Sequence, residues 1–374
     1  MSEQNMTLLV NGKIAFPEII QCIENAKVSV EINMFIWRDD NIGNRMAEAV
    51  LVAADNGVKI ILSVDRYGVV LEKSEEVKKS FFHKKQSLSE KIKINILKCL
   101  YPKNCIREKV KDEYTEIYTR IINHQNIEVR ANEYKNDHSK YYIIDDEILF
   151  LGGINIEDKE RDCDVNGRVY GDYMVKLYGS EYVKALRNKL NTGENSLEEM
   201  FYGINIKAPF RLFEMEQLYL EMISKAKSEL YITMAYFAPI KKFVKAIIEA
   251  QRRGVHVIII IPECANFQND SNRRTVRKLL KKSNGQIEIY LSPKMLHTKL
   301  IMNDDYISLG STNINPNAFS RLNELNLFVK KTNSEFEREV IDSVYNNRKE
   351  SRRVFLYKDI SYNCLMAFFE RFVI

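Results

Sequence analysis

The chain has 374 residues, of which 45% are hydrophobic and 29% charged, and its formal net charge is +5 at pH 7. This is the composition of an ordinary globular protein, long enough for two domains or two similar halves. No apolar run approaches the roughly 20 residues that a membrane-spanning helix needs, and the N-terminus lacks a secretory pattern. We therefore expect any membrane contact to be peripheral. The mild positive charge suits an anionic membrane or another polyanion.

The first half alternates between strand and helix patterns. Residues 8–10 and 28–34 have the pattern of strands, whereas residues 16–26 and 45–56 carry apolar side chains at helical spacing. A buried strand follows over residues 57–65. A strand, a helix and a strand in this order predict a parallel unit of an α/β fold.

The same order returns in the second half. Ala26-Lys27 and the strand after it match Ala226-Lys227 and the strand after it, and Gly57-Val58 matches Gly254-Val255. An internal duplication is the economical explanation, and it places the two halves at residues 1–190 and 191–374.

Two segments interrupt the repeat. The stretch from about residue 71 to 126 is rich in Lys, Glu and Ser, which predicts an inserted, solvated pair of helices; a lid over a site and a basic docking element are the alternatives. Residues 180–209 are predicted to connect the halves.

The second half adds two helices with distinctive surfaces. Residues 272–282 form a predicted basic amphipathic helix, typical of a solvated face and suited to anionic lipid or nucleic acid. The tail over 362–374 is strongly apolar when arranged as a helix. We expect it to pack on the core, and an interfacial membrane anchor is the alternative.

A repeated motif carries the chemistry. In the first copy, His138, Lys140 and Asp145 are followed by a Gly-Gly-x-Asn element that ends at Asn155. The second copy has the same spacing and a Gly-Ser-x-Asn element, with His297, Lys299, Asp304 and Asn313.

Each motif predicts two short strands joined by a turn, the first at Asp145-Asp146. Residues two apart on a strand point the same way, so His138 and Lys140 would share one face. An ammonium can bind a phosphate, and an imidazole can attack phosphorus or move a proton near neutral pH. Two such histidines suggest a nucleophile and an acid at one site.

These residues resemble the signature of the phospholipase D superfamily, and the resemblance to its bacterial cardiolipin synthase branch runs through most of the chain. It implies two similar α/β halves, with mixed or parallel sheets flanked by helices, in a pseudo-twofold bilobal body. Asn315 stands where the family commonly has Asp, and Val69 replaces a family serine after Asp65. The second motif has one residue fewer between Asp304 and Gly310 than the first has between Asp145 and Gly152, which predicts a tighter turn.

The resemblance also implies roles. His138 is the expected nucleophile and His297 the expected acid and base, while Lys140, Lys299, Asn155 and Asn313 hold the phosphate oxygens. Asp145 and Asp304 are expected to stabilise the motif turns. The acids Asp172 and Glu324 are expected to orient the histidines. The ammonium groups supply the positive charge, so we expect neither a metal nor a cofactor.

Three functions remain open at this point. The first is a phosphatidyltransferase of phospholipid biosynthesis that acts on an anionic phospholipid, phosphatidylglycerol, at the inner face of the cell membrane; a phospholipase D hydrolase differs only in its acceptor. The second is a nuclease or nucleic-acid phosphodiesterase, which is disfavoured because both motifs lie in one chain. A non-catalytic membrane-binding relative is disfavoured because both motifs keep every reactive residue.

The six cysteines have no paired CxxC spacing, which predicts reduced thiols in the cytoplasm.

Overall fold

The computed structural model describes residues 5–75, 80–82, 86–101, 115–131, 133–164 and 167–372. The chain divides into two compact units, Met1–Arg187 and Asn188–Ile374. From the sequence we expected two domains that meet between residues 190 and 191. That division into domains stays a prediction. Each unit is described separately.

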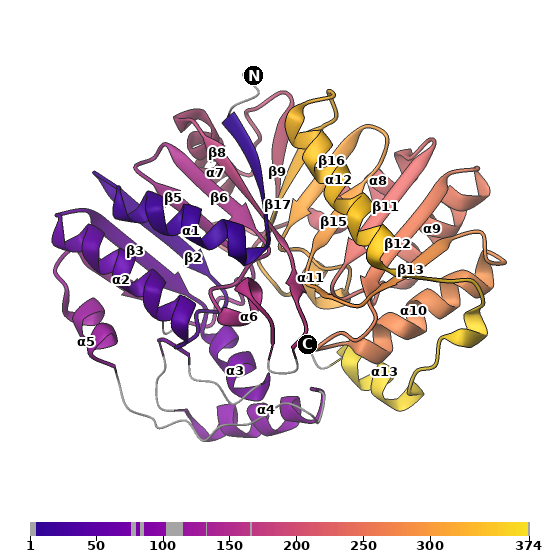
Figure 1. Cartoon of the computed structure of the whole chain (residues 1–374), viewed down its shortest axis with the longest axis horizontal. Coiled ribbons are helices and arrows are strands. Elements are labelled where there is room, and N and C mark those ends of the chain that lie inside the picture. The colour runs from indigo at the N-terminus through magenta and orange to yellow at the C-terminus, as the bar shows by residue number, and fades with distance from the viewer. Residues whose placement is uncertain are drawn as a thin grey trace. The chain divides into compact units, whose positions relative to one another are not determined.

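Unit 1 is an α/β unit built on a seven-stranded sheet (Figure 1). The order of its strands is β1-β8-β6-β5-β2-β3-β4. The strands are β1 (Met6–Val10), β2 (Ser29–Met34), β3 (Lys59–Val64), β4 (Ile127–Arg130), β5 (Tyr141–Ile144), β6 (Ile148–Gly152) and β8 (Tyr173–Tyr178), with the short β7 (Tyr170–Gly171) beside them in sequence. The helices are α1 (Asn11–Glu24), α2 (Asn41–Asp55), α3 (Arg66–Glu75), α4 (Leu88–Lys98), α5 (Glu116–Asn123), α6 (Asp158–Arg161) and α7 (Ser180–Thr192), which runs across the boundary.

The core of unit 1 lies between the sheet and the helices α1 and α2. Phe16 and Ile19 of α1 and Met46 of α2 are buried in one cluster with Ile32 of β2 and Phe150 of β6. Burying side chains of this size is the main favourable contribution to the stability of the unit. The sheet is thereby held rigidly enough to position the loops at its edge.

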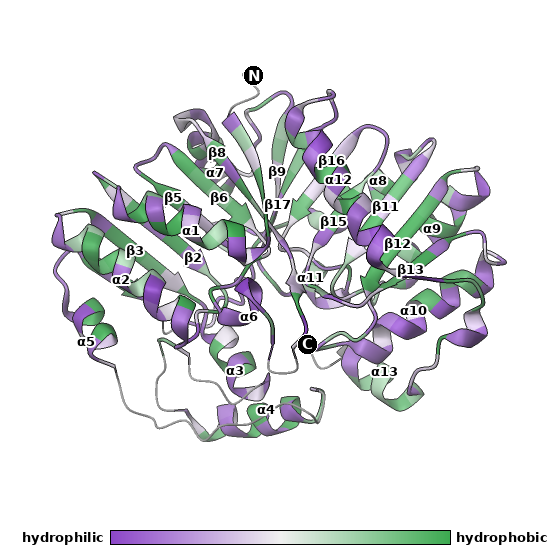
Figure 2. Cartoon of the chain, in the orientation of Figure 1, coloured by the Kyte–Doolittle hydropathy of each residue, from purple (hydrophilic) through white to green (hydrophobic). Residues whose placement is uncertain are grey.

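Unit 2 repeats this plan with a nine-stranded sheet of order β10-β9-β17-β16-β15-β11-β12-β13-β18. Its strands are β9 (Met200–Ile206), β10 (Leu212–Phe213), β11 (Glu229–Met234), β12 (His256–Pro262), β13 (Glu288–Ser292), β15 (Lys299–Met302), β16 (Tyr306–Gly310), β17 (Glu324–Lys330) and β18 (Arg352–Val354), with the short β14 (Met295–Leu296) before β15. Its helices are α8 (Met215–Lys225), α9 (Lys241–Arg252), α10 (Asn269–Lys282), α11 (Pro316–Ser320), α12 (Glu335–Glu350), η2 (Tyr357–Asp359) and α13 (Cys364–Phe372). In both units the strands are largely hydrophobic (Figure 2).

The two sheets have the same strand order over seven positions. The order β1-β8-β6-β5-β2-β3-β4 of unit 1 corresponds to β9-β17-β16-β15-β11-β12-β13 of unit 2. The predicted parallel pairs are present as β2 with β3 and β11 with β12, and the motif strands β5 with β6 and β15 with β16 are antiparallel. The predicted α/β fold in two similar halves is confirmed.

Two local predictions were wrong. The helix predicted over residues 16–26 is α1, which begins at Asn11, directly after the first strand. The predicted connection over 180–209 contains α7 and the strand β9, which pairs with β17 inside the sheet of unit 2.

Gly203 explains the second error. It lies within β9 and not in a connecting loop, and a β-carbon there would lie 2.5 Å from a ring carbon of Phe328 and 2.8 Å from Leu218. A glycine inside a strand often marks such a close approach of neighbouring side chains. The glycine therefore serves packing rather than a turn.

The insertion predicted over residues 71–126 contains the end of α3 and the whole of α4 and α5, while residues 76–79, 83–85 and 102–114 lie outside the described residues. Across the part of the chain that the structure describes, no helix combines the length and the apolar character needed to cross a membrane. The cysteines that the structure describes form no disulfide bonds: Cys22, Cys99, Cys163, Cys264 and Cys364.

Candidate active site

The first histidine and lysine lie just before β5, at the end of the strand opposite its hairpin turn. His138 and Lys140 are both buried, and both contact the ring of Phe35, which follows β2. The imidazole meets that ring edge to face at 4.8 Å between centroids, and the Lys140 ammonium lies 5.2 Å from its centre. One aromatic ring thus contacts both side chains, as expected if they share a face.

The loop that carries His138 is held by Asp65. One carboxylate oxygen of Asp65 accepts hydrogen bonds from the backbone N–H groups of Lys135 and Asp137, each at 3.0 Å, and the other oxygen accepts from Tyr67 at 2.7 Å. Burial raises the pKa of Asp65 to about 6, although these N–H groups act in the opposite direction. The sequence placed Asp65 in a family-like turn but gave no sign that it reaches the motif loop.

Asp145, the aspartate of the first motif, lies at the other end of β5 from Lys140. Its carboxylate accepts hydrogen bonds from the consecutive backbone N–H groups of Lys27, Val28 and Ser29, which lead into β2. These bonds fix the start of β2 relative to the hairpin turn. The geometry agrees with a structural rather than a chemical contribution of Asp145.

Asp304 makes the equivalent contacts in unit 2. Its carboxylate accepts from the backbone N–H groups of Lys227 and Ser228 and from the Ser228 hydroxyl. Desolvation acts to raise its pKa, but these hydrogen bonds outweigh it and lower the pKa of Asp304 to about 2. A two-residue turn at Asp304-Asp305 replaces the three-residue turn of the first motif. The tighter turn predicted here is confirmed.

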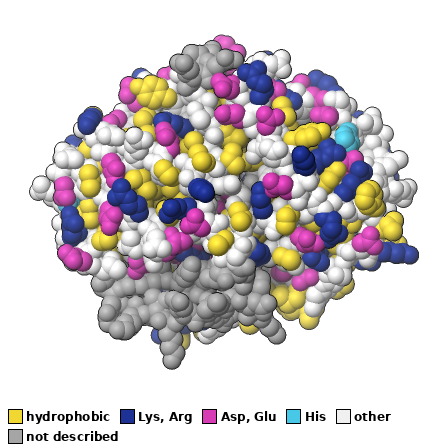
Figure 3. All heavy atoms as spheres, in the orientation of Figure 1, with side chains coloured by type: hydrophobic (Ala, Val, Ile, Leu, Met, Phe, Trp, Pro, Cys, Tyr) yellow, Lys and Arg dark blue, Asp and Glu magenta, His cyan; other side chains and the backbone are white. Residues whose placement is uncertain are grey.

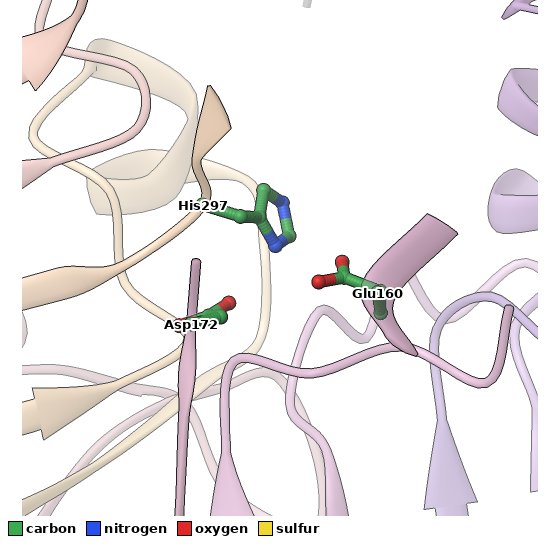
Figure 4. Close-up of side chains that lie close together, drawn as sticks. All are labelled: Glu160, Asp172 and His297. Carbon is green, nitrogen blue, oxygen red and sulfur yellow. The ribbon is translucent and has the colours of Figure 1, made fainter. Parts of the chain in front are cut away.

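The second histidine and lysine have a different aromatic neighbour. His297, labelled in Figure 4, follows β14, and Lys299 opens β15. Both are buried, and the Lys299 ammonium donates to the backbone carbonyl of His297, as the Lys140 ammonium does to that of His138. The ring of Tyr236 meets His297 edge to face at 6.0 Å between centroids. No sequence pattern points to Phe35 or Tyr236, because each lies after a strand more than 60 residues from the histidine it contacts.

The two motif asparagines follow β6 and β16 and are buried. Asn313 accepts a hydrogen bond of 3.3 Å from the backbone N–H of Tyr236, which ties the Gly-Ser-x-Asn element to the aromatic neighbour of His297. Among the described residues, the Oδ1 atom of Asn155 has no hydrogen-bond partner. A buried polar atom of this kind usually has a partner in the working protein, such as water or a ligand.

Asp172 lies against the glycine pair of the first motif. Its Oδ1 accepts from the backbone N–H of Tyr173 at 2.8 Å, and its own N–H donates to the side chain of Asn11. Glu160 of α6 places a carboxylate oxygen within 4.8 Å of one from Asp172 (Figure 4). No sequence pattern points to Glu160, because the residues around it are those that commonly surround a surface acid.

Glu324 is the structural counterpart of Asp172. The strand pairs Gly152 with Met174 and Gly310 with Asn326 put both acids two residues before the partner of the motif glycine. The hydroxyl of Ser311 donates to Glu324 at 2.5 Å, and Ser311 corresponds to Gly153. Each unit therefore carries a buried acid beside its Gly-x-x-Asn element.

A buried ion network supports the segment after Asn155. The guanidinium of Arg38 lies 2.5 Å from Glu157 and 2.6 Å from Glu75, and the Lys159 ammonium lies 2.6 Å from Glu75. Burial acts to raise the pKa of Glu157, but the nearby Lys159 and Arg38 lower it overall. The paired charges are satisfied within the network, so they fix the backbone after Asn155 rather than offer a free cation.

Each unit thus presents one buried set of an imidazole, an ammonium, an amide and a carboxylate, positioned by equivalent strands. The imidazole can act as nucleophile or proton carrier, and the ammonium and amide can hold anionic oxygens. This fold and this doubled residue set are those of a phospholipase D-type enzyme.

The chain belongs to the family described as cardiolipin synthase, PLD-like domain, whose model matches residues 19–192 and 219–344. It is 26% identical over 345 residues to cardiolipin synthase B of Shigella flexneri, covering 86% of this chain and 75% of the relative. It is 25% identical over 352 residues to a probable cardiolipin synthase of Bacillus subtilis, covering 87% of this chain and 63% of the relative.

Solved structures share the fold at low sequence identity. A phosphatidylserine synthase of Haemophilus influenzae matches with a TM-score of 0.69 and 14% identity, over 96% of this chain and 90% of that one. A polyphosphate kinase of Porphyromonas gingivalis matches with a TM-score of 0.55 and 12% identity, over 98% of this chain and 52% of that one. At these identities the likeness concerns the fold alone.

Proposed function

We propose that the protein is a phosphatidyltransferase that joins two phosphatidylglycerol molecules into cardiolipin and releases glycerol. The observation that carries the proposal is the doubled residue set, with a buried histidine and lysine at equivalent strand ends of both units. The family and the names of the relatives support a phospholipid as the substrate. The enzyme would act as a peripheral protein at the inner face of the cell membrane.

The first step transfers the phosphatidyl group to the protein. A ring nitrogen of His138 attacks phosphorus, a P–N bond forms, and the bond from phosphorus to the glycerol oxygen breaks. His297, in its protonated form, gives its proton to the departing alkoxide, which leaves as glycerol.

The second step returns both histidines to their starting states. His297, now neutral, takes the proton from a hydroxyl of the second phosphatidylglycerol, whose oxygen attacks phosphorus as the P–N bond breaks. Lys140, Lys299, Asn155 and Asn313 hold the non-bridging oxygens, where negative charge accumulates. Asp172 and Glu324 orient the imidazoles, and Asp145 and Asp304 stabilise the hairpins.

Water in place of the second lipid would make the same residues a hydrolase that releases phosphatidic acid. The two reactions differ only in the acceptor that attacks phosphorus in the second step, so analysis of the products separates them. A nucleic-acid phosphodiester is the remaining alternative, and the basic helix α10 is the feature that favours it.

Mass spectrometry of the lipid products tests the proposal. The protein is incubated with phosphatidylglycerol vesicles in the presence and absence of EDTA. Cardiolipin from the unchanged protein, and none from His138→Ala or His297→Ala, is the expected result. His124→Ala and His256→Ala serve as matched controls, because these histidines lie outside both motifs and bond to Asp55 and Glu288. Both control variants should keep full activity.

Three outcomes would overturn the proposal. Phosphatidic acid without cardiolipin would identify a hydrolase. Full activity of either motif variant would remove the requirement for two histidines. No lipid product, together with cleavage of DNA or RNA by the unchanged protein, would identify a nuclease.

A further inference from the structure

The last helix of unit 2, α13, is held on α10 by polar contacts along one of its faces. The Ser271 hydroxyl donates to the carbonyl of Ala367 at 3.0 Å, and the Ser271 N–H donates to the carboxylate of Glu370 at 2.7 Å. The side-chain amide of Gln268 donates to the carbonyl of Glu370 at 3.0 Å. Ala367 and Glu370 are buried, so this face of α13 packs against α10.

The opposite face of α13 is apolar and exposed. Leu365, Phe368 and Phe369 recur at helical spacing and are 64%, 53% and 46% exposed. Scattered exposed apolar residues are normal on a protein surface, but a cluster on one helix face calls for an explanation. All the exposed large hydrophobic residues that the structure describes in unit 2 lie between residues 345 and 369.

The segment before α13 adds to this apolar surface. Phe355 and Leu356, which follow β18, are 67% and 61% exposed. The next residue, Tyr357, lies under the cations of Arg277 and Lys281 of α10, and Arg277 donates to the carbonyl of Ile360 at 2.6 Å. The exposed apolar side chains are therefore carried by a segment that is bound to α10.

The other end of α10 borders a basic groove. A hollow of about 480 Å³ lies between α9 and α10, with Val244 and Ile248 as its buried apolar floor. Five cations line it and one acid, Glu249, accompanies them: Lys241, Lys245, Arg252, Lys278 and Lys282. The five cations are exposed, and Figure 3 shows Lys and Arg side chains along this side of unit 2, with hydrophobic side chains where Figure 1 places α13.

We propose that this surface of unit 2, formed by α13, the segment 355–357 and the groove between α9 and α10, binds a bilayer of anionic phospholipid. Aromatic and leucine side chains enter the boundary between head groups and acyl chains, and clustered Lys and Arg side chains bind the lipid phosphates. A nucleic acid would use the cations but leaves the apolar face of α13 uncovered, which is why the bilayer is the better occupant. The inference adds a docking surface to the proposed function. The docking surface is tested by vesicle binding and the proposed function by the lipid products, so either can fail alone.

Vesicle binding by the full chain tests the proposal. Phosphatidylglycerol vesicles and pure phosphatidylcholine vesicles are compared by co-sedimentation over a range of salt concentrations. The unchanged protein should bind the anionic vesicles with a salt dependence. The triple variant Leu365→Ser, Phe368→Ser, Phe369→Ser should bind them about 10-fold more weakly. The triple variant Lys245→Gln, Lys278→Gln, Lys282→Gln should bind about 10²-fold more weakly and with less dependence on salt.

Matched controls distinguish binding through this surface from the effects of net charge and of nonspecific hydrophobic binding. Lys13→Gln, Lys59→Gln and Lys184→Gln remove the same charge from exposed lysines of unit 1, and Ile14→Ser with Val52→Ser removes exposed apolar side chains there. Both controls should bind like the unchanged protein. Equal losses in the controls, or no binding by the unchanged protein, would overturn the proposal. So would a cation variant that loses DNA binding but keeps vesicle binding.

A second measurement does not depend on the stability of a multiple variant. Trp37 is the one tryptophan of the chain and is fully buried, so Phe369→Trp adds one exposed reporter. Its fluorescence should be quenched by anionic vesicles with brominated acyl chains. Fluorescence that is unchanged when such vesicles are bound would show that α13 does not enter the bilayer.

Discussion

Gly153 and Asp172 occupy adjoining space, and a side chain at the first would displace the second. A β-carbon at Gly153 would lie 2.6 Å from Oδ1 of Asp172 and nearer still to Oδ2. In unit 2 the equivalent pair is Ser311 and Glu324, and there the small residue donates a hydrogen bond to the acid. The missing side chain in one unit and the hydroxyl in the other both keep the acid at a defined position.

Gly153→Ala is therefore predicted to lower activity more than stability. The added methyl group forces the Asp172 carboxylate to shift by several tenths of an ångström or more. Misplacement of a catalytic group by about 1 Å can reduce the rate about 10²-fold. Cardiolipin formation and the midpoint of urea unfolding are measured together. Gly57→Ala is a matched control, because nothing lies within 4 Å of a β-carbon there. The positive φ of 88° at this position strains an alanine, so this variant should lose stability but keep its activity. Equal activity of Gly153→Ala and the unchanged protein would show that the position of Asp172 does not matter.

Asp65→Asn is predicted to reduce kcat with little change in KM. Asp65 accepts N–H groups at both oxygens, two from the loop before His138 and one from Tyr67. An asparagine has one carbonyl oxygen, so its NH₂ group must face an N–H donor and one of these contacts is lost. The loop would then hold His138 less firmly, and we expect a loss of about 10-fold or more in kcat. Asp146→Asn, in the hairpin turn of the same motif, removes an exposed ion pair with Arg187 and serves as the control. An equal loss in the control would assign the effect to general destabilisation.

The sequence was sufficient for the doubled fold and for the motif residues, because each has a local pattern. Alternation and helical spacing identified β2, α2 and β3 and their counterparts, and the fixed spacing identified His138, Lys140, His297 and Lys299. Asp145 illustrates what spacing alone does not give. It lies seven residues after His138 in the motif, yet the strand β5 separates the two in space, and its partners are the backbone N–H groups of residues 27–29.

Contacts between distant segments could not be predicted in the same way. Phe35 and His138 meet because β2 and β5 are neighbours in the sheet, and Asp65 reaches the loop at Lys135 because β3 ends beside it. The place of Gly203 inside a strand could not be predicted, since its packing against Phe328 depends on the pairing of β9 with β17. Strand order, which local periodicity does not contain, decides each of these contacts.

Asp304→Asn is predicted to destabilise the protein by about 1–2 kcal/mol at pH 7, because an amide accepts the N–H groups of Lys227 and Ser228 less well than a carboxylate. The adjacent Asp305→Asn is the control, since it removes an exposed ion pair with Lys227, and such pairs contribute little. The pKa of Asp304 is lowered to about 2, so its ionised form stabilises the folded state above its ordinary pKa of 3.8. The difference between the unchanged protein and Asp304→Asn should shrink as the pH falls from about 4 to about 2. Urea unfolding over this range measures it, and a difference that stays constant would contradict the assignment.

Glu72 is fully buried beside the ion network of unit 1. Burial raises its pKa to about 8; the charge of Arg38 opposes this shift, and those of Glu157 and Asp40 add to it. A carboxyl group with a raised pKa is protonated in the folded protein and ionised in the unfolded chain between its ordinary pKa of 4.5 and about 8. The contribution of Glu72 to stability is therefore present at low pH and is lost as the pH rises through this range.

Glu72→Gln removes this titration and keeps the size of the side chain. The variant should be close to the unchanged protein in stability near pH 5 and more stable by about 1–3 kcal/mol near pH 8. Asp40 and Asp65 have pKa values raised to about 7 and about 6, so they titrate in the same range. They are present in both proteins, so the difference in the free energy of unfolding reports the titration of Glu72 together with its coupling to Asp40. Glu48→Gln, at an exposed position of α2, should show no such dependence on pH. A difference between Glu72→Gln and the unchanged protein that does not grow from pH 5 to pH 8 would mean that Glu72 is ionised in the folded state and stabilised by Arg38.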